Sequence, residues 1–236
     1  MSEAVSQSPA GPIKIDIWSD VACPWCYIGK RRFEAGAGQF IGSGDGRRIE
    51  VEFHSFELSP DTPIDFAGNE IDYLARHKGI SPEQADQMLR QVTGIAKQVG
   101  LDYHFETLQH TNTVKAHELI HFAKAHGKQD EMKERLLQAY FVDGGHVGRI
   151  DDLVEYAGEI GLDRDQARTA LETGSYLPAV RQDQKAAAEY GINGVPFYVI
   201  DERYGVSGAQ EPATFTQVLE QVWQERPQPA PTEVSQ

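Results

Sequence analysis

The two cysteines of this chain lie two residues apart, in the segment Cys23-Pro24-Trp25-Cys26. Alternating apolar residues at 13–17 predict a strand before this segment, and residues 23–37 are predicted to form a helix. The first turn of a helix has unpaired N–H groups and a partial positive charge, so we expect a lowered pKa for Cys23. Cys26 follows about one turn later on the same side, where it can close a disulfide with Cys23. The pair therefore predicts a redox centre at a strand–helix junction.

Composition limits the classes of partner. The chain has 236 residues, 40% of them hydrophobic, and a formal net charge of −14. Such a charge disfavours nucleic acid and anionic membrane surfaces as partners. The sequence contains no apolar run long enough to span a membrane, and its N-terminus lacks the basic and apolar regions of a secretory signal. We therefore expect a cytoplasmic protein, in which a cysteine pair is catalytic or metal-binding and not a structural disulfide.

The order of predicted elements indicates one helical block between two mixed segments. Residues 1–12 and 226–236 are expected to be flexible tails. Residues 13–62 contain two strands joined by a helix, which predicts a parallel βαβ unit. Helical periodicity without strands dominates 63–190, whereas 191–225 reads as a strand, a hairpin partner and a final helix. Within the helical block we expect helices starting at Ser81 and at about 112–126, 129–141, 150–160, 163–173 and 177–190.

A second signal is Pro196, at the start of the apolar run 197–200. By itself a proline at a strand start is ordinary, and its peptide bond is usually trans. In a thioredoxin-like fold, however, a proline at this point faces the cysteine pair and is preceded by a cis bond. We therefore expect a cis bond between Val195 and Pro196, with the Val195 backbone turned outward to pair with a substrate strand.

Four segments in the same order resemble the DsbA family, and its FrnE-like branch most closely. They are Cys23 to Arg31, Asn112 to His117, Ala139-Tyr140-Phe141 and Gly194 to Phe197. The resemblance extends from about residue 13 to residue 225. It implies an α/β structure, a thioredoxin fold with a large α-helical domain inserted between the second and third strands. It also implies thiol–disulfide exchange on proteins without a bound cofactor. Some FrnE-like proteins carry an additional C-terminal cysteine pair, which this chain lacks, so no relay through a second disulfide is expected.

The resemblance and the residues together suggest a site. Cys23 and Cys26 are the expected catalytic residues, and Pro24, Trp25, Val195 and Pro196 are expected to contact substrate. The large ring of Trp25 has little to pack against between the cysteines, so we expect it to be exposed.

Asp16 is a further candidate, because redox domains of this fold often bury an acid on the first strand beneath the pair. It would move a proton to or from Cys26. Its spacing from Cys23 is one residue longer than expected, and a solvated residue near the strand end is the alternative. Lys30, Arg31 and Arg32 are expected to form a solvated helix face.

A competing motif is His117-Glu118-Leu119-Ile120-His121, which matches the H-E-x-x-H pattern of zinc enzymes. Two histidines one turn apart on a helix can bind zinc, with the glutamate as general base. The extended form fails, because Lys124 and Gly127 stand where glycine and histidine are required. We therefore expect no metal site here and interpret these residues as packing near the domain junction.

We interpret the chain as a thiol–disulfide oxidoreductase of the protein disulfide oxidase or isomerase type. Its partners would be protein or small-molecule thiols and disulfides, with glutathione as a candidate redox partner and no cofactor beyond the redox-active disulfide. The residues predict no particular oligomeric state.

Three alternatives stay open. A glutathione-dependent kappa-type transferase or isomerase, similar to 2-hydroxychromene-2-carboxylate isomerase, shares the domain layout but usually has serine in place of Cys23 and no partner at Cys26. The others are a zinc metalloprotease and a binding module that senses oxidants.

Overall fold

The cysteine pair lies between the central strand of the sheet and the first helix. The computed structural model describes residues 11–44 and 46–226. In it, β1 (Ile13–Ser19) pairs in parallel with β2 (Ile49–Ser55) and antiparallel with β3 (Phe197–Ile200), which pairs antiparallel with β4 (Tyr204–Ser207). The strand order is β2-β1-β3-β4, and a helical region lies between β2 and β3. The predicted α/β thioredoxin fold with a helical insertion is therefore confirmed.

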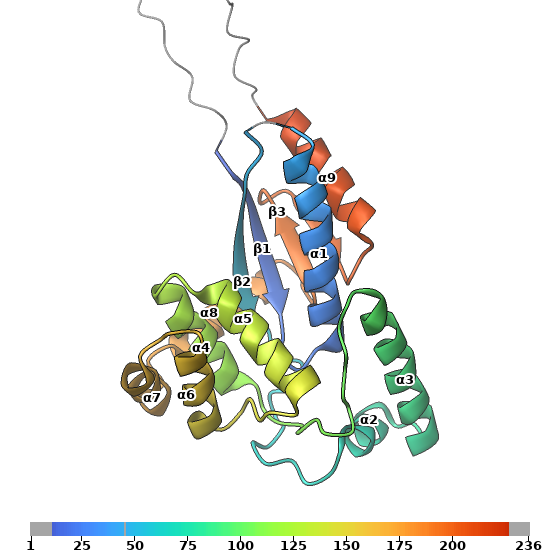
Figure 1. Cartoon of the computed structure of the whole chain (residues 1–236), viewed down its shortest axis with the longest axis vertical. Coiled ribbons are helices and arrows are strands. Elements are labelled where there is room, and N and C mark those ends of the chain that lie inside the picture. Colours follow the sequence, from blue (N-terminus) through green and yellow to red (C-terminus); the bar gives the residue numbers. More distant parts are fainter. Residues whose placement is uncertain (1–10, 45, 227–236) are drawn as a thin grey trace, which may run out of the picture.

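The two faces of the sheet have different coverings because successive strand residues point to opposite sides. Ile13, Ile15 and Ile17 of β1 pack into a core with the helices α1 (Pro24–Gly42) and α9 (Pro212–Glu225). These two helices lie side by side along the sheet (Figure 1). Trp18 points to the other face and packs against Ala187 of α8 (Leu177–Glu189).

The helical region forms a separate core below the sheet, next to the first turn of α1 (Figure 1). Its first helix was not predicted. Asn69 and Asp72 form a reciprocal capping box at its start, and Gly79 ends it in the left-handed conformation. The helices are α2 (Glu70–Lys78), α3 (Pro82–Gln98), α4 (Val114–Ala125), α5 (Gln129–Gln138), α6 (Ile150–Glu159) and α7 (Arg164–Thr173), with the π-helical turn η1 (Ala139–Asp143) after α5.

Helix α1 is joined to the helical region by ion pairs. Lys30, which was predicted to be solvated, is only 5% exposed, and its ammonium lies 3.1 Å from both Asp130 and Glu134 of α5. That prediction was wrong because a side chain on α1 can face solvent only where no helix from a distant part of the sequence covers it.

Residues 1–10 and 227–236 of the expected tails lie outside the described residues, and the predicted boundaries at 63 and 190 stay predictions. Across residues 11–44 and 46–226, no helix has both the length and the apolar character required to cross a membrane.

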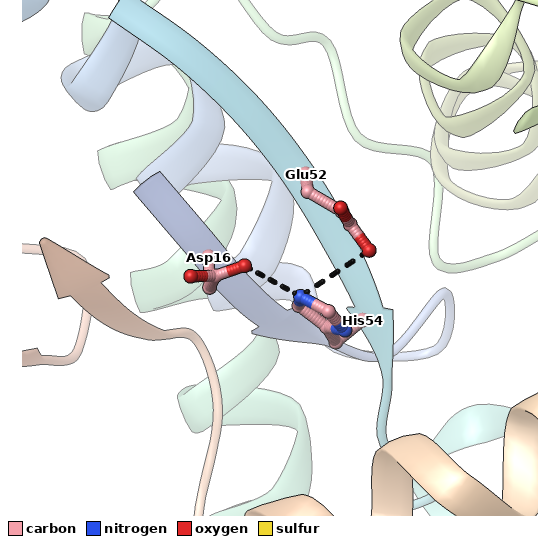
Figure 2. A group of neighbouring side chains, drawn as sticks. All are labelled: Asp16, Glu52 and His54. Carbon is pink, nitrogen blue, oxygen red and sulfur yellow. Dashed lines mark hydrogen bonds and ion pairs between the residues drawn. The ribbon is translucent and has the colours of Figure 1, made fainter. Parts of the chain in front are cut away.

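A chain of buried ion pairs connects the sheet with α8. His54 of β2 lies between two carboxylates, with Nε2 2.9 Å from Asp16 Oδ1 (Figure 2) and Nδ1 2.8 Å from Asp183 Oδ1. Burial disfavours the imidazolium, but the hydrogen bonds to Asp16 and Asp183 outweigh it and raise the pKa of His54 to about 9. The histidine is therefore positively charged at neutral pH, and it holds Asp183 of the helical region against the sheet.

Stability should depend on pH through this histidine. A raised pKa in the folded state stabilises the protein fully below pH 6.5, and this contribution is lost as pH rises through about 9. At about 1.36 kcal/mol per pKa unit, the rise corresponds to roughly 3 kcal/mol. In urea unfolding, the difference in free energy between the native protein and His54→Gln should be larger by about that amount at pH 6 than above pH 9. His126→Gln is the matched control, because His126 contacts a backbone carbonyl. A difference that does not change with pH would contradict the assignment.

Gly29 permits a close contact between α1 and β3. A Cβ at this position would lie 2.7 Å from Tyr198 Oη and 2.9 Å from Pro196 Cγ. Because both distances are shorter than real contacts allow, only glycine lets α1 lie this close to Pro196 and to Tyr198 of β3.

Gly29→Ala should therefore lower the free energy of unfolding by roughly 1–3 kcal/mol, the usual effect of overpacking. Gly38 lies in the same helix with open space around its Cα. Gly38→Ala should raise stability by about 0.5–1 kcal/mol through helix propensity alone. Denaturant unfolding of both variants measures the contrast, and equal effects of the two substitutions would show that the contact at Gly29 is unimportant.

Candidate redox site

The cysteine pair occupies the first turn of α1. Cys23 is the N-cap residue with an extended backbone, and Pro24 takes the next position, where its missing N–H is not needed. The backbone N–H of Cys26 donates to the carbonyl of Cys23 at 3.0 Å. The two cysteines lie 3.4 Å apart, both as free thiols, and each is 3% exposed. Little movement is needed to join them in a disulfide.

The segment before β3 faces this pair. The peptide bond between Val195 and Pro196 is cis, as predicted. The Cys23 sulfur lies 3.5 Å from the carbonyl oxygen of Val195. The chain thus brings Val195 and Pro196, which are far away in sequence, against the expected catalytic cysteine.

Cys23 borders a cavity that Cys26 does not line. The cavity has a volume of about 260 Å³, and Pro24 and Trp25 line it as well. Trp25 is 37% exposed, as expected for a ring between the cysteines. The hydroxyl of Tyr103 donates to the Pro24 carbonyl at 2.7 Å, which fixes the first turn of α1 against the helical region. A substrate can therefore reach Cys23 before Cys26.

The two thiols share one negative charge easily and a second one with difficulty. Burial opposes ionisation of Cys26, but the hydrogen bond from Cys23 and the positive charge of Lys133 lower its pKa, helped by the Ser19 hydroxyl. The hydrogen bond with Cys26, followed by burial, raises the pKa of Cys23 well above its ordinary value, and the charge of Asp20 adds to this. The reduced pair thus holds its charge on the Cys26 side, where we had expected Cys23 to be the more acidic thiol.

Lys133 of α5 is the cation that acts on the pair from the helical region. It is 1% exposed, and its ammonium lies 5.9 Å from the centre of the Phe53 ring. Burial lowers the pKa of Lys133, and the charge on Cys26 opposes this. A signal for this lysine is present in the sequence, because Leu136, Leu137 and Tyr140 follow it three, four and seven residues later. A lysine on the apolar face of a helix is unusual and marks a candidate functional residue.

Asp16 lies on the other side of the sheet. It points to the α8 face, where it pairs with His54 and, at 3.2 Å, with Lys14 (Figure 2 shows the pair with His54). The structure therefore does not bring it together with Cys26, whereas Ser19 and Asp20, which were not singled out, lie at the pair. The physical reason is the alternation of β1, which places Asp16 opposite to the α1 face.

The histidines of the H-E-x-x-H motif are held by two different carboxylates. His117 Nε2 lies 3.2 Å from Asp20 Oδ1, and His121 Nε2 lies 2.9 Å from Asp183 Oδ2. Glu118 forms an ion pair with Lys115 at 2.8 Å. These contacts support the interpretation of the motif as packing at the domain junction.

Within the described parts of the chain, one group of acidic and histidine side chains has ligand atoms close enough to share a metal ion: Asp16, Glu52 and His54 (Figure 2). Lys14 binds Asp16, Lys124 binds Glu52, and the raised pKa of His54 keeps its ring protonated. Each of these three groups is therefore already paired with a charged neighbour within the chain.

A thioredoxin fold with a dithiol at the start of its first helix, opposite a cis-proline, defines the class of thioredoxin-like proteins. Residues 14–220 match the family of the DSBA-like thioredoxin domain, and the chain belongs to this family. The assignment to the FrnE-like branch stays a prediction.

Similar proteins agree with this assignment. A crystal structure of a probable DsbA oxidoreductase from Streptomyces coelicolor is 38% identical, with a TM-score of 0.85 over 94% of both chains. YwbO, an uncharacterized protein of Bacillus subtilis (strain 168), is 32% identical over 80% of this chain and 88% of its own. The cytosolic disulfide reductase DsbM from Pseudomonas aeruginosa, solved with glutathione, shares the fold at 18% identity, with a TM-score of 0.63 over 89% of this chain and 99% of DsbM.

Replacing Lys133 with an uncharged residue should destabilise the thiolate form of the cysteine pair without lowering the free energy of unfolding. In Lys133→Met the first pKa of the cysteine pair should rise, because the cation that favours a charge on Cys26 is gone. The free energy of unfolding should stay the same or increase, since burying a charge is itself unfavourable. Titration of the thiolate absorbance and denaturant unfolding measure the two effects.

The matched control is Lys185→Met, on an exposed part of α8, which should change neither quantity. An unchanged thiol pKa in Lys133→Met would contradict the role assigned to this lysine.

Proposed function

We propose that the protein is a thiol–disulfide oxidoreductase of the disulfide oxidase or isomerase type, acting through Cys23 and Cys26. One observation carries the proposal. The two thiols lie 3.4 Å apart, and Cys23 both faces the Val195 carbonyl and borders a cavity. Membership in the DSBA-like family and the similarity to a probable DsbA oxidoreductase support it.

The geometry supports a two-step exchange. In reduction, Cys23 first passes its proton to Cys26, and the Cys23 thiolate then attacks one sulfur of a substrate disulfide, forming a mixed disulfide and releasing the other sulfur as a thiolate. The substrate backbone is held against Val195 and Pro196. Cys26 then loses its proton and attacks Cys23, so that the enzyme disulfide forms and the substrate leaves as a thiol. Oxidation and isomerisation use the same steps in reverse or in part.

Lys133 and Ser19 would act in the second step. Cys26 must become a thiolate inside a buried site, where a charge without a partner is strongly disfavoured. The ammonium of Lys133 and the Ser19 hydroxyl stabilise this charge, as the lowered pKa of Cys26 indicates. Attack by Cys26 on the mixed disulfide is therefore faster than attack on it by a thiol from solution.

The preferred direction depends on the reduction potential of the pair. A potential of about −120 to −180 mV, as in DsbA and protein disulfide isomerase, favours oxidation or isomerisation, whereas about −270 mV, as in thioredoxin, favours reduction. Titration against glutathione measures this potential, and it tests glutathione as a redox partner at the same time. A cytoplasmic site of action stays a prediction from the sequence.

For each of the three alternatives, one feature of the site argues against it. A kappa-type glutathione enzyme needs no second thiol, but here Lys133 and Ser19 lower the pKa of Cys26 and so favour the thiolate that resolves a mixed disulfide. A zinc protease needs free histidines at 117 and 121, but both are engaged with carboxylates. A non-catalytic oxidant sensor needs no substrate surface, but Cys23 borders the cavity and faces Val195.

Cys23→Ser should lower turnover of disulfide reduction by about a thousandfold or more, because it removes the nucleophile. Cys26→Ser should react once and then stop as a mixed disulfide, because the resolving thiol is gone. Insulin reduction measures turnover, and mass spectrometry of the non-reduced protein detects the trapped adduct. Cys23→Ser with full turnover would refute the proposal, and so would a Cys26→Ser protein that forms no adduct.

A further inference from the structure

Asp20 is a buried carboxylate in the turn that leads from β1 to the cysteine pair. It is 1% exposed, and it is one of the residues that line the cavity beside Cys23. The backbone N–H of Cys23 donates to the Asp20 carbonyl at 3.4 Å, which closes the turn. The side chain folds back onto the same turn, because the backbone N–H of Ala22 donates to Asp20 Oδ1 at 3.3 Å. The carboxylate therefore lies against the backbone that carries Cys23.

Donors from two distant parts of the chain also hold this carboxylate. The backbone N–H of Leu58 donates to Oδ2 at 2.8 Å, and Nε2 of His117 lies 3.2 Å from Oδ1. A carboxylate only accepts hydrogen bonds, so Nε2 of His117 donates in either charge state of the ring. Burial opposes ionisation of Asp20, but these hydrogen bonds, that from His117 first, lower its pKa. Asp20 is therefore negatively charged at neutral pH.

The hydrogen bonds need an acceptor, but they do not need a charge. An asparagine side chain has an oxygen that accepts hydrogen bonds and carries no charge. What the aspartate adds is a fixed negative charge beside a thiol that has to become a thiolate. Solvent screens such a buried charge only weakly. The hydrogen bond with Cys26 and burial raise the pKa of Cys23, and the charge of Asp20 raises it further.

The backbone of the same residue acts in the opposite direction on the second cysteine. Burial raises the pKa of Cys26, whereas Cys23, Lys133 and Ser19 lower it, and a backbone hydrogen bond from Asp20 lowers it further. One residue thus disfavours a negative charge on the first sulfur and favours it on the second.

We propose that Asp20 is a positioning residue of the redox reaction, whose carboxylate opposes a negative charge on Cys23 and whose backbone favours that charge on Cys26. The reduced pair is then less stable, relative to the disulfide, than it would be without the carboxylate. Asp20 therefore favours reduction of substrates, whereas Lys133, which stabilises the thiolate, favours oxidation. This inference rests on the proposed disulfide exchange and names a group that sets the preferred direction of that reaction.

Other titratable groups surround Asp20, and they come from several elements. They are Cys23, Cys26 of α1, Tyr73 of α2, His117 of α4, Lys133 of α5 and Tyr140 of η1. All of them are present both in the native protein and in Asp20→Asn, so the difference between these two proteins isolates the charge of Asp20.

The rate at which iodoacetamide alkylates Cys23 measures the thiolate share of this sulfur. The thiolate attacks the carbon of the reagent, a C–S bond forms and iodide leaves, and mass spectrometry of peptides identifies the modified cysteine. In Asp20→Asn the rate at pH 6 should rise about threefold. A thiolate share that is about tenfold larger is partly offset by the lower nucleophilicity of a more acidic thiol.

Asp183→Asn is the matched control. Asp183 is also a buried carboxylate that is held by histidines and by one backbone N–H, that of Ser55 at 2.7 Å, but it lies on α8. Its replacement changes similar contacts without removing a charge from the turn before Cys23. The alkylation rate of Cys23 should therefore stay at the native value.

The reduction potential is a second readout, which a merely structural role would not move in the same way. It is titrated against glutathione between pH 5 and pH 9. At pH 9 the equilibrium of Asp20→Asn should favour the reduced pair about tenfold more than that of the native protein, a potential about 30 mV less negative. Towards pH 5 the thiols of both proteins become protonated, so this difference should shrink.

His117→Leu keeps the test decisive where Asp20→Asn fails to fold. It removes one donor from the Asp20 carboxylate and retains the backbone donors of Ala22 and Leu58. The negative charge beside Cys23 is then less compensated, and the alkylation rate should fall below the native rate. A site that is merely loosened would be alkylated faster in both variants.

An alkylation rate of Asp20→Asn equal to the native rate would overturn the role of Asp20, and so would a difference in potential that does not change with pH. In both cases disulfide exchange itself proceeds. A native protein whose cysteines form no disulfide with glutathione as the redox buffer would instead refute the proposed function. The two failures therefore give different results.

Discussion

The redox site depends on the contact between the first turns of α1 and the segment that precedes β3. Gly29 leaves no room for a side chain between the helix and Pro196, so the two elements meet at van der Waals distance. This closeness allows the Cys23 thiol to reach the Val195 carbonyl.

Charge compensation ties the helical region to the thioredoxin part. Asp183 of α8 binds His54, His117 of α4 binds Asp20, and Lys133 of α5 stabilises a negative charge on Cys26. In a buried environment the negative charges of Asp183, Asp20 and Cys26 would each be strongly unfavourable alone. The helical region therefore sets the electrostatics of the cysteine pair in addition to covering it. The cavity beside Cys23 lies at the same boundary, which is where ligand pockets preferentially occur.

Local patterns predicted the parts of the site that lie on consecutive residues. The cysteine pair at a strand–helix junction and the exposed ring of Trp25 agree with the structure, and so does the cis bond at Pro196, which the likeness to thioredoxin-like folds implied. One error concerns a residue whose surroundings come from far along the chain, and another concerns a helix whose local signals were overlooked. Lys30 was assigned to solvent, but α5 covers it. Helix α2 was missed, although Asn69, Asp72 and Gly79 mark its ends.

The sequence by itself determined the chemistry, because the spacing of the cysteines, the helix start and the strand alternation are set by neighbouring residues. The tertiary structure decided which charged groups act on that chemistry. Asp16 faces α8 and lies away from the pair, whereas the charge of Lys133 acts on Cys26 from a helix about a hundred residues away. Burial and pairing depend on which elements pack together, and no local pattern of residues contains that information.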